Sequence, residues 1–383
     1  MKKIYFDNNA TTPVDPAVRE AMLPYLGDIF GNPSSDHEYG EAAKDGLEAA
    51  RKQVAALIGC AVDRVIFTSG GTEANNLAIL SSISAYPDRK HIISSLVEHP
   101  SVLSVLKFLK QNFGYEIEYL PVGSSGGIDL QVLSSLIRDE TALVSLIGAN
   151  NETGVLWPIA EIGEICSDKD VLFHSDTVQM AGKKELNVGE LPVDYISLAS
   201  HKLYGPKGAG ALYVRRGVSV MPQVMGGGQE GGRRAGTENV PGIVGFGKAC
   251  EIGAQELTRY SGQMKILKDR LTRGILENIP DVLINGQNEP RLANTLNVSF
   301  KHASSAAMIQ DLEVRGIAVS AISACHSGDQ NPSQVLVAMG VPEPYLHGAL
   351  RISLGRYNTE EEVEAFLDIL PDVAAKSRSG FAV

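Results

Sequence analysis

The segment 65-VIFTSGGTEANNLAILSSIS-84 decides the fold, because a glycine turn in it joins a short apolar run to a helical pattern. We predict a strand over Val65–Ser69 and a helix over Thr72–Ser84. Further strands are expected over His91–Ser95, Glu116–Pro121, Ala142–Ile147, Val171–His174, Asp194–Leu198 and Gly210–Val214, with helices over Pro100–Asn112, Leu130–Arg138 and Ile159–Asp168. This alternation predicts an α/β fold, with a mostly parallel seven-stranded sheet sandwiched by helices.

The last third of the chain has a different pattern. A long helical stretch, with at most one break, runs from Val240 to Asn278 after the glycine-rich segment Gly226–Gly236. Strands are then expected over Asn294–Phe300, Ala318–Ser320 and Leu350–Ser353, followed by a helix over Glu360–Leu370. We predict an N-terminal arm (1–15) packed with the small domain, a large domain (16–255) and a small α+β domain (256–383).

Composition excludes several classes of protein. The 383 residues include 45 acidic and 34 basic side chains, for a net charge of −11, which argues against nucleic acid as a partner. No apolar run approaches the ~20 residues that a membrane helix needs, and the start MKKIYFDNN has no apolar core of a secretory signal. We therefore expect a cytoplasmic protein that neither spans nor binds a membrane.

The four cysteines are far apart in the sequence. They have no C-x-x-C spacing and no histidine at ligand spacing, so we expect neither a metal site nor a disulfide. Cys60, Cys166 and Cys250 lie in apolar or helix-like stretches that are typical of packing. Cys325 lies in SAISACHSGDQNPS, a loop pattern, and a thiol in that setting is as consistent with reactivity as with a passive role.

Five junctions at predicted strand ends could carry chemistry. The turn 67-FTSGGTE-73 offers the N–H groups of a helix start and the Thr72 hydroxyl to a phosphate, although Thr72 as a simple helix cap is the more common role. In 97-VEHPS-101, His99 could cap the next helix, transfer protons or stack on a flat ligand. The amides of 148-GANNETG-154 could form a turn or bind ligand oxygens.

The other two junctions contain charged groups after apolar runs. Asp176, in 173-FHSDTVQ-179, must be paired because an isolated buried carboxylate is costly, and its partner could be structural or a ring nitrogen. Lys202, in 198-LASHKLYGPKG-208, could be a surface lysine or an amine that forms a Schiff base. Pyridoxal phosphate requires an anion site for its phosphate, an acidic partner for its ring nitrogen, a residue that stacks on its ring and an amine, and these junctions together offer all four.

With these residues the chain resembles the pyridoxal-phosphate cysteine desulfurases of the fold type I aminotransferases. The resemblance extends from YFDNNATTPVDP to RISLGRYNTEEEV and rests on the motifs GNPSS, FTSGGTEANN, EHPSV, NNETG, DTVQ, SHKLYGPKG, GGGQE, RRAGTEN, SACHS and LRISLGR. It implies that Lys202 carries the cofactor, that Asp176 pairs with the ring nitrogen and that His99 stacks on the ring. The remaining cofactor ligands it implies are Gly71, Thr72, Asn151, Gln179 and His201.

The resemblance also implies a substrate site, a nucleophile and partners. Arg351, with Asn32 and Asn151, would hold the substrate carboxylate, and Cys325 would take the sulfur as a persulfide. Thr237 would reach the cofactor phosphate of the partner in a homodimer, and a sulfur acceptor or scaffold protein is expected for iron–sulfur assembly or thio-modification. Many family members have a serine three positions before the lysine, where this chain has Ala199, so Ser200 is the candidate substitute. Selenocysteine lyases share several of these motifs and are the alternative.

Overall fold

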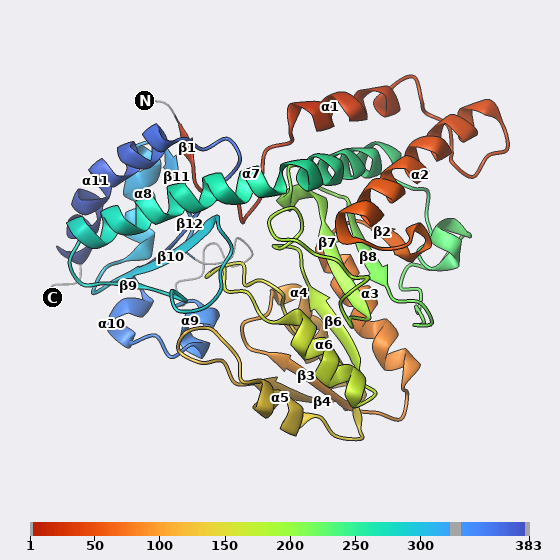
Figure 1. Cartoon of the computed structure of the whole chain (residues 1–383), viewed down its shortest axis with the longest axis horizontal. Coiled ribbons are helices and arrows are strands. Elements are labelled where there is room, and N and C mark those ends of the chain that lie inside the picture. Colours follow the sequence, from red (N-terminus) through yellow and green to blue (C-terminus); the bar gives the residue numbers. More distant parts are fainter. Residues whose placement is uncertain (1–2, 322–330, 380–383) are drawn as a thin grey trace.

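The structure, a computed structural model of the chain, describes residues 3–321 and 331–379 (Figure 1). Its larger part is built around a seven-stranded sheet in the order β2-β8-β7-β6-β5-β3-β4. The strands are β2 (Val65–Thr68), β3 (His91–Ser95), β4 (Glu116–Leu120), β5 (Thr141–Ser145), β6 (Leu172–Asp176), β7 (Tyr195–Ala199) and β8 (Gly210–Val214). All seven predicted strands are present, with ends shifted by no more than two residues. Only β8 runs antiparallel to its neighbours, which confirms the mostly parallel sheet.

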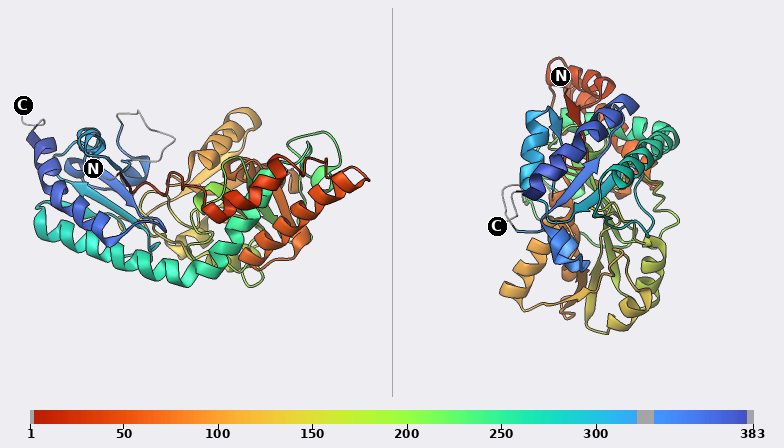
Figure 2. Two further views of the ribbon diagram at one scale, coloured as in Figure 1. Left: turned by 90° about the horizontal axis from the view of Figure 1, so that it is seen from above. Right: turned by 90° about the vertical axis from the view of Figure 1, so that its left-hand side faces the viewer.

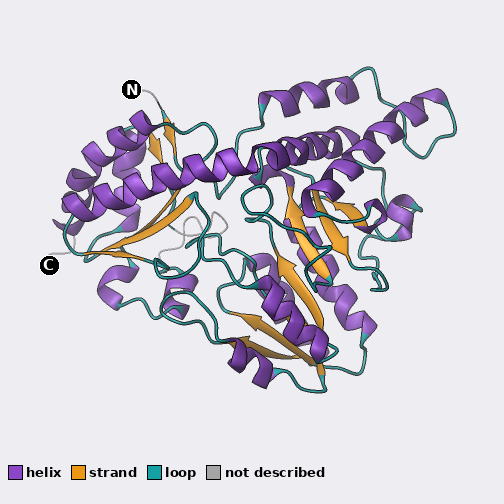
Figure 3. Cartoon of the chain, viewed as in Figure 1, coloured by secondary structure: helices purple, strands orange, loops and turns teal. Residues whose placement is uncertain are grey.

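Helices cover both faces of this sheet (Figure 3). Helices α3 (Gly71–Ala85) and α4 (Pro100–Phe113) pack on one face, where they meet inward side chains such as Ile66. The other face is covered by α2 (Glu38–Ile58), α5 (Leu130–Leu136), α6 (Ile159–Asp168) and the first half of α7 (Val240–Asn278), which contact residues such as Phe67. The strands are therefore buried on both sides, which explains why their sequences read as continuous apolar runs.

The smaller part contains a three-stranded antiparallel sheet in the order β12-β10-β9. Its strands are β9 (Val282–Ile284), β10 (Thr295–Phe300) and β12 (Ala349–Ser353), and α8 (Ser305–Val314) and α11 (Glu360–Ser379) pack on it. Two short helices, α9 (Gln334–Ala338) and α10 (Glu343–Leu346), complete this part, which matches the predicted α+β pattern. The domain boundaries at residues 15 and 255 stay predictions.

The first residues of the chain lie against the smaller part. Strand β1 (Ile4–Tyr5) pairs in parallel with β11 (Ile317–Ala318), and Asp7 continues beside Ser353 of β12. The chain then crosses to the large sheet, where it forms α1 (Pro16–Met22). Residues 7–12 thus pass between the two parts (Figure 1).

Helix α7 joins both parts as one continuous helix of 39 residues, about 58 Å long (Figure 2). Its early glycines allow close packing: a Cβ on Gly247 would lie 2.5 Å from the Cα of Ala50 in α2. They do not interrupt the helix, so the break that the sequence analysis allowed does not occur. Within the described residues, no helix combines the length and the apolar character needed to span a bilayer.

Candidate active site

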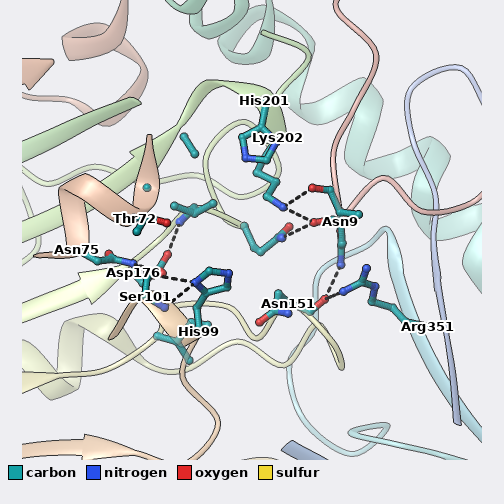
Figure 4. Close-up of a pocket in the computed structure, with 16 residues that line it drawn as sticks. Asn9, Thr72, Asn75, His99, Ser101, Asn151, Asp176, His201, Lys202 and Arg351 are labelled. Carbon is teal, nitrogen blue, oxygen red and sulfur yellow. Dashed lines mark hydrogen bonds between the residues drawn. The ribbon is translucent and has the colours of Figure 1, made fainter. Parts of the chain in front are cut away.

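A cavity of about 200 Å³ lies where β2, β3, β5, β6 and β7 end (Figure 4). The N-terminal arm and β12 close it from the opposite side. Nine of the predicted site residues line it: Gly71, Thr72, His99, Asn151, Asp176, Gln179, His201, Lys202 and Arg351. They come from positions 71 to 351 of the chain, so the fold brings together residues that the sequence analysis selected one motif at a time.

The start of α3 forms one end of the cavity. No side chain caps this helix, although Glu73 is close by. The carboxylate of Glu73 instead accepts from Ser69 N at 2.8 Å and pairs with Arg234 at 2.8 Å. Gly71 is packed so tightly that a Cβ there would lie 2.7 Å from Cγ2 of Val178. Uncapped N–H groups and the positive end of the helix dipole at this position suit a phosphate.

Asp176 ends β6 and faces the cavity with only 5 % of its surface exposed. Its Oδ1 accepts from the N–H of Val178 at 3.0 Å, and its Oδ2 accepts from Nδ2 of Asn75 at 2.7 Å. These two donors hold the carboxylate in one orientation at the cavity wall. A buried carboxylate held in this way can keep the nitrogen of a bound pyridine ring protonated.

Lys202 lies in the short helical turn η3 (Ser200–Lys202) that follows β7. Its Nζ donates to the carbonyl oxygens of Asn9 and Ala10, both at 2.6 Å, so the N-terminal arm directs the amine. Beside it, burial and the positive charge of Lys202 lower the pKa of His201 to about 4. His201 is therefore a neutral imidazole at pH 7 and can donate a hydrogen bond to a phosphate without adding charge.

Asn9 connects several of these groups. Its carbonyl oxygen also accepts from Nε2 of Gln179 at 3.0 Å, and its side chain bonds Asn151 O and Thr295 Oγ1. The buried Nζ of Lys183 donates to Oε1 of Gln179 at 2.8 Å, and burial, with the charges of Lys202 and Arg351, lowers the pKa of Lys183 to about 7. The arm thus orients the amine and Gln179 together.

Arg351, on β12, is 1 % exposed. Its Nη2 pairs with Oδ1 of Asp7 at 2.7 Å and its Nη1 donates to Asn151 O at 3.3 Å. Its Nε has no hydrogen-bond partner among the described residues. A buried guanidinium with a donor to spare, at the wall of the cavity, suits a ligand carboxylate.

Three predicted residues do not line this cavity, and a fourth is not among the described residues. Ser200 is fully buried, with its Oγ turned toward Gly205, and Asn32 is exposed, with its Oδ1 accepting from Ser34 N. Thr237 is exposed and lines a separate cavity of about 160 Å³. Cys325 lies outside the described residues. The roles of these four stay predictions.

The sequence analysis did not identify several residues that shape the cavity: Asp7, Asn9, Ala10, Asn75, Ser101, Ile147, Val178 and Lys183. One of them had a usable signal: Asn75 is three residues after Thr72 in the predicted helix, so it shares a helical face with a predicted site residue. Asp7 and Asn9 had none, since they reach the site only by contacts with distant segments.

The residues that line the cavity fit pyridoxal 5'-phosphate. An uncapped helix start suits its phosphate, a buried carboxylate suits its ring nitrogen and an amine suits its aldehyde, and all three face the same cavity. Together with the sheet order and the antiparallel β8, they define a fold type I enzyme that uses this cofactor. The Aminotransferase class-V family model matches residues 4–366. The chain belongs to this family and, within it, to the cysteine desulfurases.

Individual relatives support this assignment. A cysteine desulfurase of a Nostoc species is 46 % identical over 379 residues, covering 99 % of this chain and 94 % of that protein. The cysteine desulfurase IscS of Methanosarcina thermophila is also 46 % identical, covering 99 % and 93 %. A solved NifS-like protein is 39 % identical with a TM-score of 0.92, covering 98 % of this chain and all of that one. These matches favour a cysteine desulfurase over the selenocysteine lyase alternative.

Proposed function

We propose that this chain converts L-cysteine to L-alanine, that the sulfur is held as a persulfide on Cys325, and that it is then passed to an acceptor. The observation that carries the proposal is the arrangement of Lys202, Asp176 and Arg351 around one cavity, in a chain whose relatives are cysteine desulfurases. When bound, pyridoxal phosphate withdraws electrons from the Cα of an amino acid. The residues around the cavity must hold the cofactor, orient the substrate and move protons.

Seven residues are proposed to hold the cofactor, with Ser200 as a further candidate. Lys202 binds it covalently, and once released the same amine can take the Cα proton of the substrate. Asp176 keeps the ring nitrogen protonated, and Gln179 and Asn151 bond the ring oxygen. The phosphate is held by the N–H groups at Gly71 and by Thr72 and His201, with Ser200 as a further candidate. This assignment is supported by the position of these residues around the cavity, apart from Ser200, which does not line it.

Substrate orientation is assigned to Arg351, with Asn151 and Asn32 as further ligands. The Nε of Arg351 is the donor left over by Asp7 and Asn151, so it can bond a carboxylate without breaking either contact. His99 lines the same cavity and is proposed to move a proton at the substrate thiol. Carboxylate binding at one end and a proton-transfer group at the other would fix the reacting sulfur.

The sulfur-transfer step needs a thiolate. The Sγ of Cys325 attacks the substrate sulfur, an S–S bond forms, the C–S bond breaks and its electron pair remains on the carbon that becomes the methyl group of alanine after protonation. Burial raises the pKa of the Cys60 and Cys166 thiols to about 12 and that of Cys250 well above its usual value. These three cysteines are therefore unsuited to the step.

Replacing Cys325 tests this assignment. In Cys325→Ser, the cofactor should still bind and give its visible absorption band, but alanine and sulfide should no longer form from cysteine. Cys60→Ser is the matched control and should retain wild-type turnover. Full activity of Cys325→Ser would contradict the persulfide step. Trapping the persulfide with a thiol-alkylating reagent, followed by mass spectrometry, would locate the transferred sulfur directly.

A homodimer is also proposed, in which Thr237 of one subunit bonds the cofactor phosphate of the other. Support comes from the loop that carries it: Glu230 pairs with Arg51 at 2.7 Å and Arg234 pairs with Glu73 at 2.8 Å, which fixes an exposed Thr237. Mixed dimers of Thr237→Ala and Lys202→Ala subunits should regain about one working site per dimer. Activity no higher than that of the Thr237→Ala parent would contradict the shared site.

The sulfur acceptor is proposed to be a protein that serves iron–sulfur cluster assembly or thio-modification in the cytoplasm. The IscS name of the Methanosarcina thermophila relative is the support for the first of these. Loading the enzyme with ³⁵S-cysteine and following the label into proteins or RNA of the host would identify the acceptor class.

A further inference from the structure

A chain of hydrogen bonds behind the cavity connects Asp176 to His99 through two side chains with no role so far. Asn75 is 1 % exposed, and its Nδ2 donates both to Oδ2 of Asp176, at 2.7 Å, and to Oγ of Ser101, at 2.8 Å. An ionised carboxylate can only accept, so the amide nitrogen and not the amide oxygen must face Asp176. The orientation of Asn75 is therefore fixed by the carboxylate.

This orientation decides the direction of the next hydrogen bond. Because Oγ of Ser101 accepts from Asn75, its own proton is available to His99, whose Nδ1 lies 2.7 Å away. The backbone N–H of Ser101 points to the same Nδ1 at 3.2 Å, since His99 is the N-cap of α4. Two donors thus converge on Nδ1 (Figure 4).

A ring nitrogen that accepts two hydrogen bonds carries no proton, and a neutral imidazole must then carry its proton on the other nitrogen. The helix dipole at the start of α4 adds to this preference, since positive charge is unfavourable there. We propose that Asn75 and Ser101 are positioning residues that hold neutral His99 with its proton on Nε2, on the cavity side of the ring. His99 then meets a bound ligand as a proton donor.

The inference deepens the proposed function and rests on it for the identity of the ligand. His99 cannot take a proton at Nε2 until it has given one up from that atom. Full transfer of that proton to a ligand needs a second proton at Nδ1, because its loss alone would leave an imidazolate anion. The position of the proton on His99 is fixed from Asp176, which orients Asn75 and is also the carboxylate proposed to serve the ring nitrogen.

Nitrogen NMR on the substrate-free holoenzyme, labelled with ¹⁵N-histidine, tests the proton position directly. Two-bond proton–nitrogen correlations distinguish the two neutral tautomers, and His99→Gln assigns the signal by its loss. Wild-type protein should show His99 with Nε2 protonated and Nδ1 unprotonated. In Ser101→Ala the Nδ1 signal should move toward the protonated form, and kcat should fall about 10-fold, a fraction of the ~10²–10⁴-fold typical of acid–base catalysis.

Two variants make the result specific. Ser101→Thr keeps the hydroxyl and should restore both the NMR pattern and kcat, whereas Ser104→Ala, an exposed serine one turn along α4, should change neither. A wild-type signal with the proton on Nδ1, or a Ser101→Ala pattern equal to wild type, would overturn the inference. Wild-type enzyme that makes no alanine from cysteine would defeat the proposed function and leave the NMR result standing.

Discussion

The half of the cavity formed by the large sheet differs from the half formed by the N-terminal arm and β12 in how the chain brings its residues together. Thr72, Asp176 and Lys202 each follow the end of their own strand, so local sequence places them. Asn9 and Arg351 depend on partners that are distant in the sequence: Asp7 and Arg351 are 344 positions apart. In the first half, the strand ends of the sheet position the functional side chains. In the second half, buried polar contacts between distant segments position them.

The largest expected effect is on the sheet side. Lys202→Ala should abolish the visible band of the bound cofactor and reduce cysteine turnover to background, because Lys202 is the only lysine among the described residues that line the cavity. Absorption spectra and alanine release measure both effects. Lys207→Ala, an exposed lysine of the same segment, should behave as wild type. A normal cofactor band in Lys202→Ala would contradict the assignment of the sheet side.

A smaller effect is expected where the arm meets β12. Asp7→Ala leaves the buried guanidinium of Arg351 without its ion pair, which typically costs about 3–5 kcal/mol of unfolding free energy. The exposed pair of Arg315 and Asp372 gives the comparison, and Asp372→Ala should lower the unfolding free energy much less. Urea denaturation measures both. Equal losses in the two variants would show that the arm is not held by this pair.

The smallest effect concerns Glu98, which is buried behind the sheet edge and accepts from Ser95 Oγ at 2.7 Å and Ile147 N at 2.9 Å. Burial raises the pKa of Glu98 from 4.5 to about 8. The folded protein keeps this proton over a range in which the unfolded chain has lost it, so the stability from this group is complete below about pH 4.5 and declines as the pH rises toward 8.

Glu98→Gln imitates the protonated carboxyl and should remove that decline. We expect its unfolding free energy to change less than that of wild type between pH 5 and pH 8 in urea titrations. The same pH dependence in both proteins would mean that Glu98 is ionised in the folded state. The result sharpens the comparison of the two halves, because it shows how completely the sheet side excludes water from a buried carboxyl group.

The sequence allowed the sheet side to be predicted well, for a physical reason. Parallel strands buried on both faces have continuous apolar runs, and glycine, proline and polar residues mark where each ends, so Gly71, His99 and Asp176 stand out. The sequence analysis assigns no helix at α2, because that segment follows no strand signal, and it allows one break in α7, which is a continuous helix whose early glycines pack closely against α2.

The arm side could not be predicted in the same way. Asn9 gains its role from contacts with Asn151, Gln179 and Thr295, and nothing near position 9 indicates them. Arg351 was selected through the family resemblance, but its ion pair with Asp7 and its spare Nε appeared only in the folded chain. Polar contacts between distant segments leave no periodic pattern in a sequence.

The central claim is that this cavity removes sulfur from cysteine. The most direct measurement is to supply L-cysteine to the holoenzyme and to quantify alanine and sulfide together, with and without a reductant. The account predicts alanine and sulfide in equal amounts when the reductant is present, with sulfide falling when it is left out. A keto acid in place of alanine, or the absence of both products, would contradict the account.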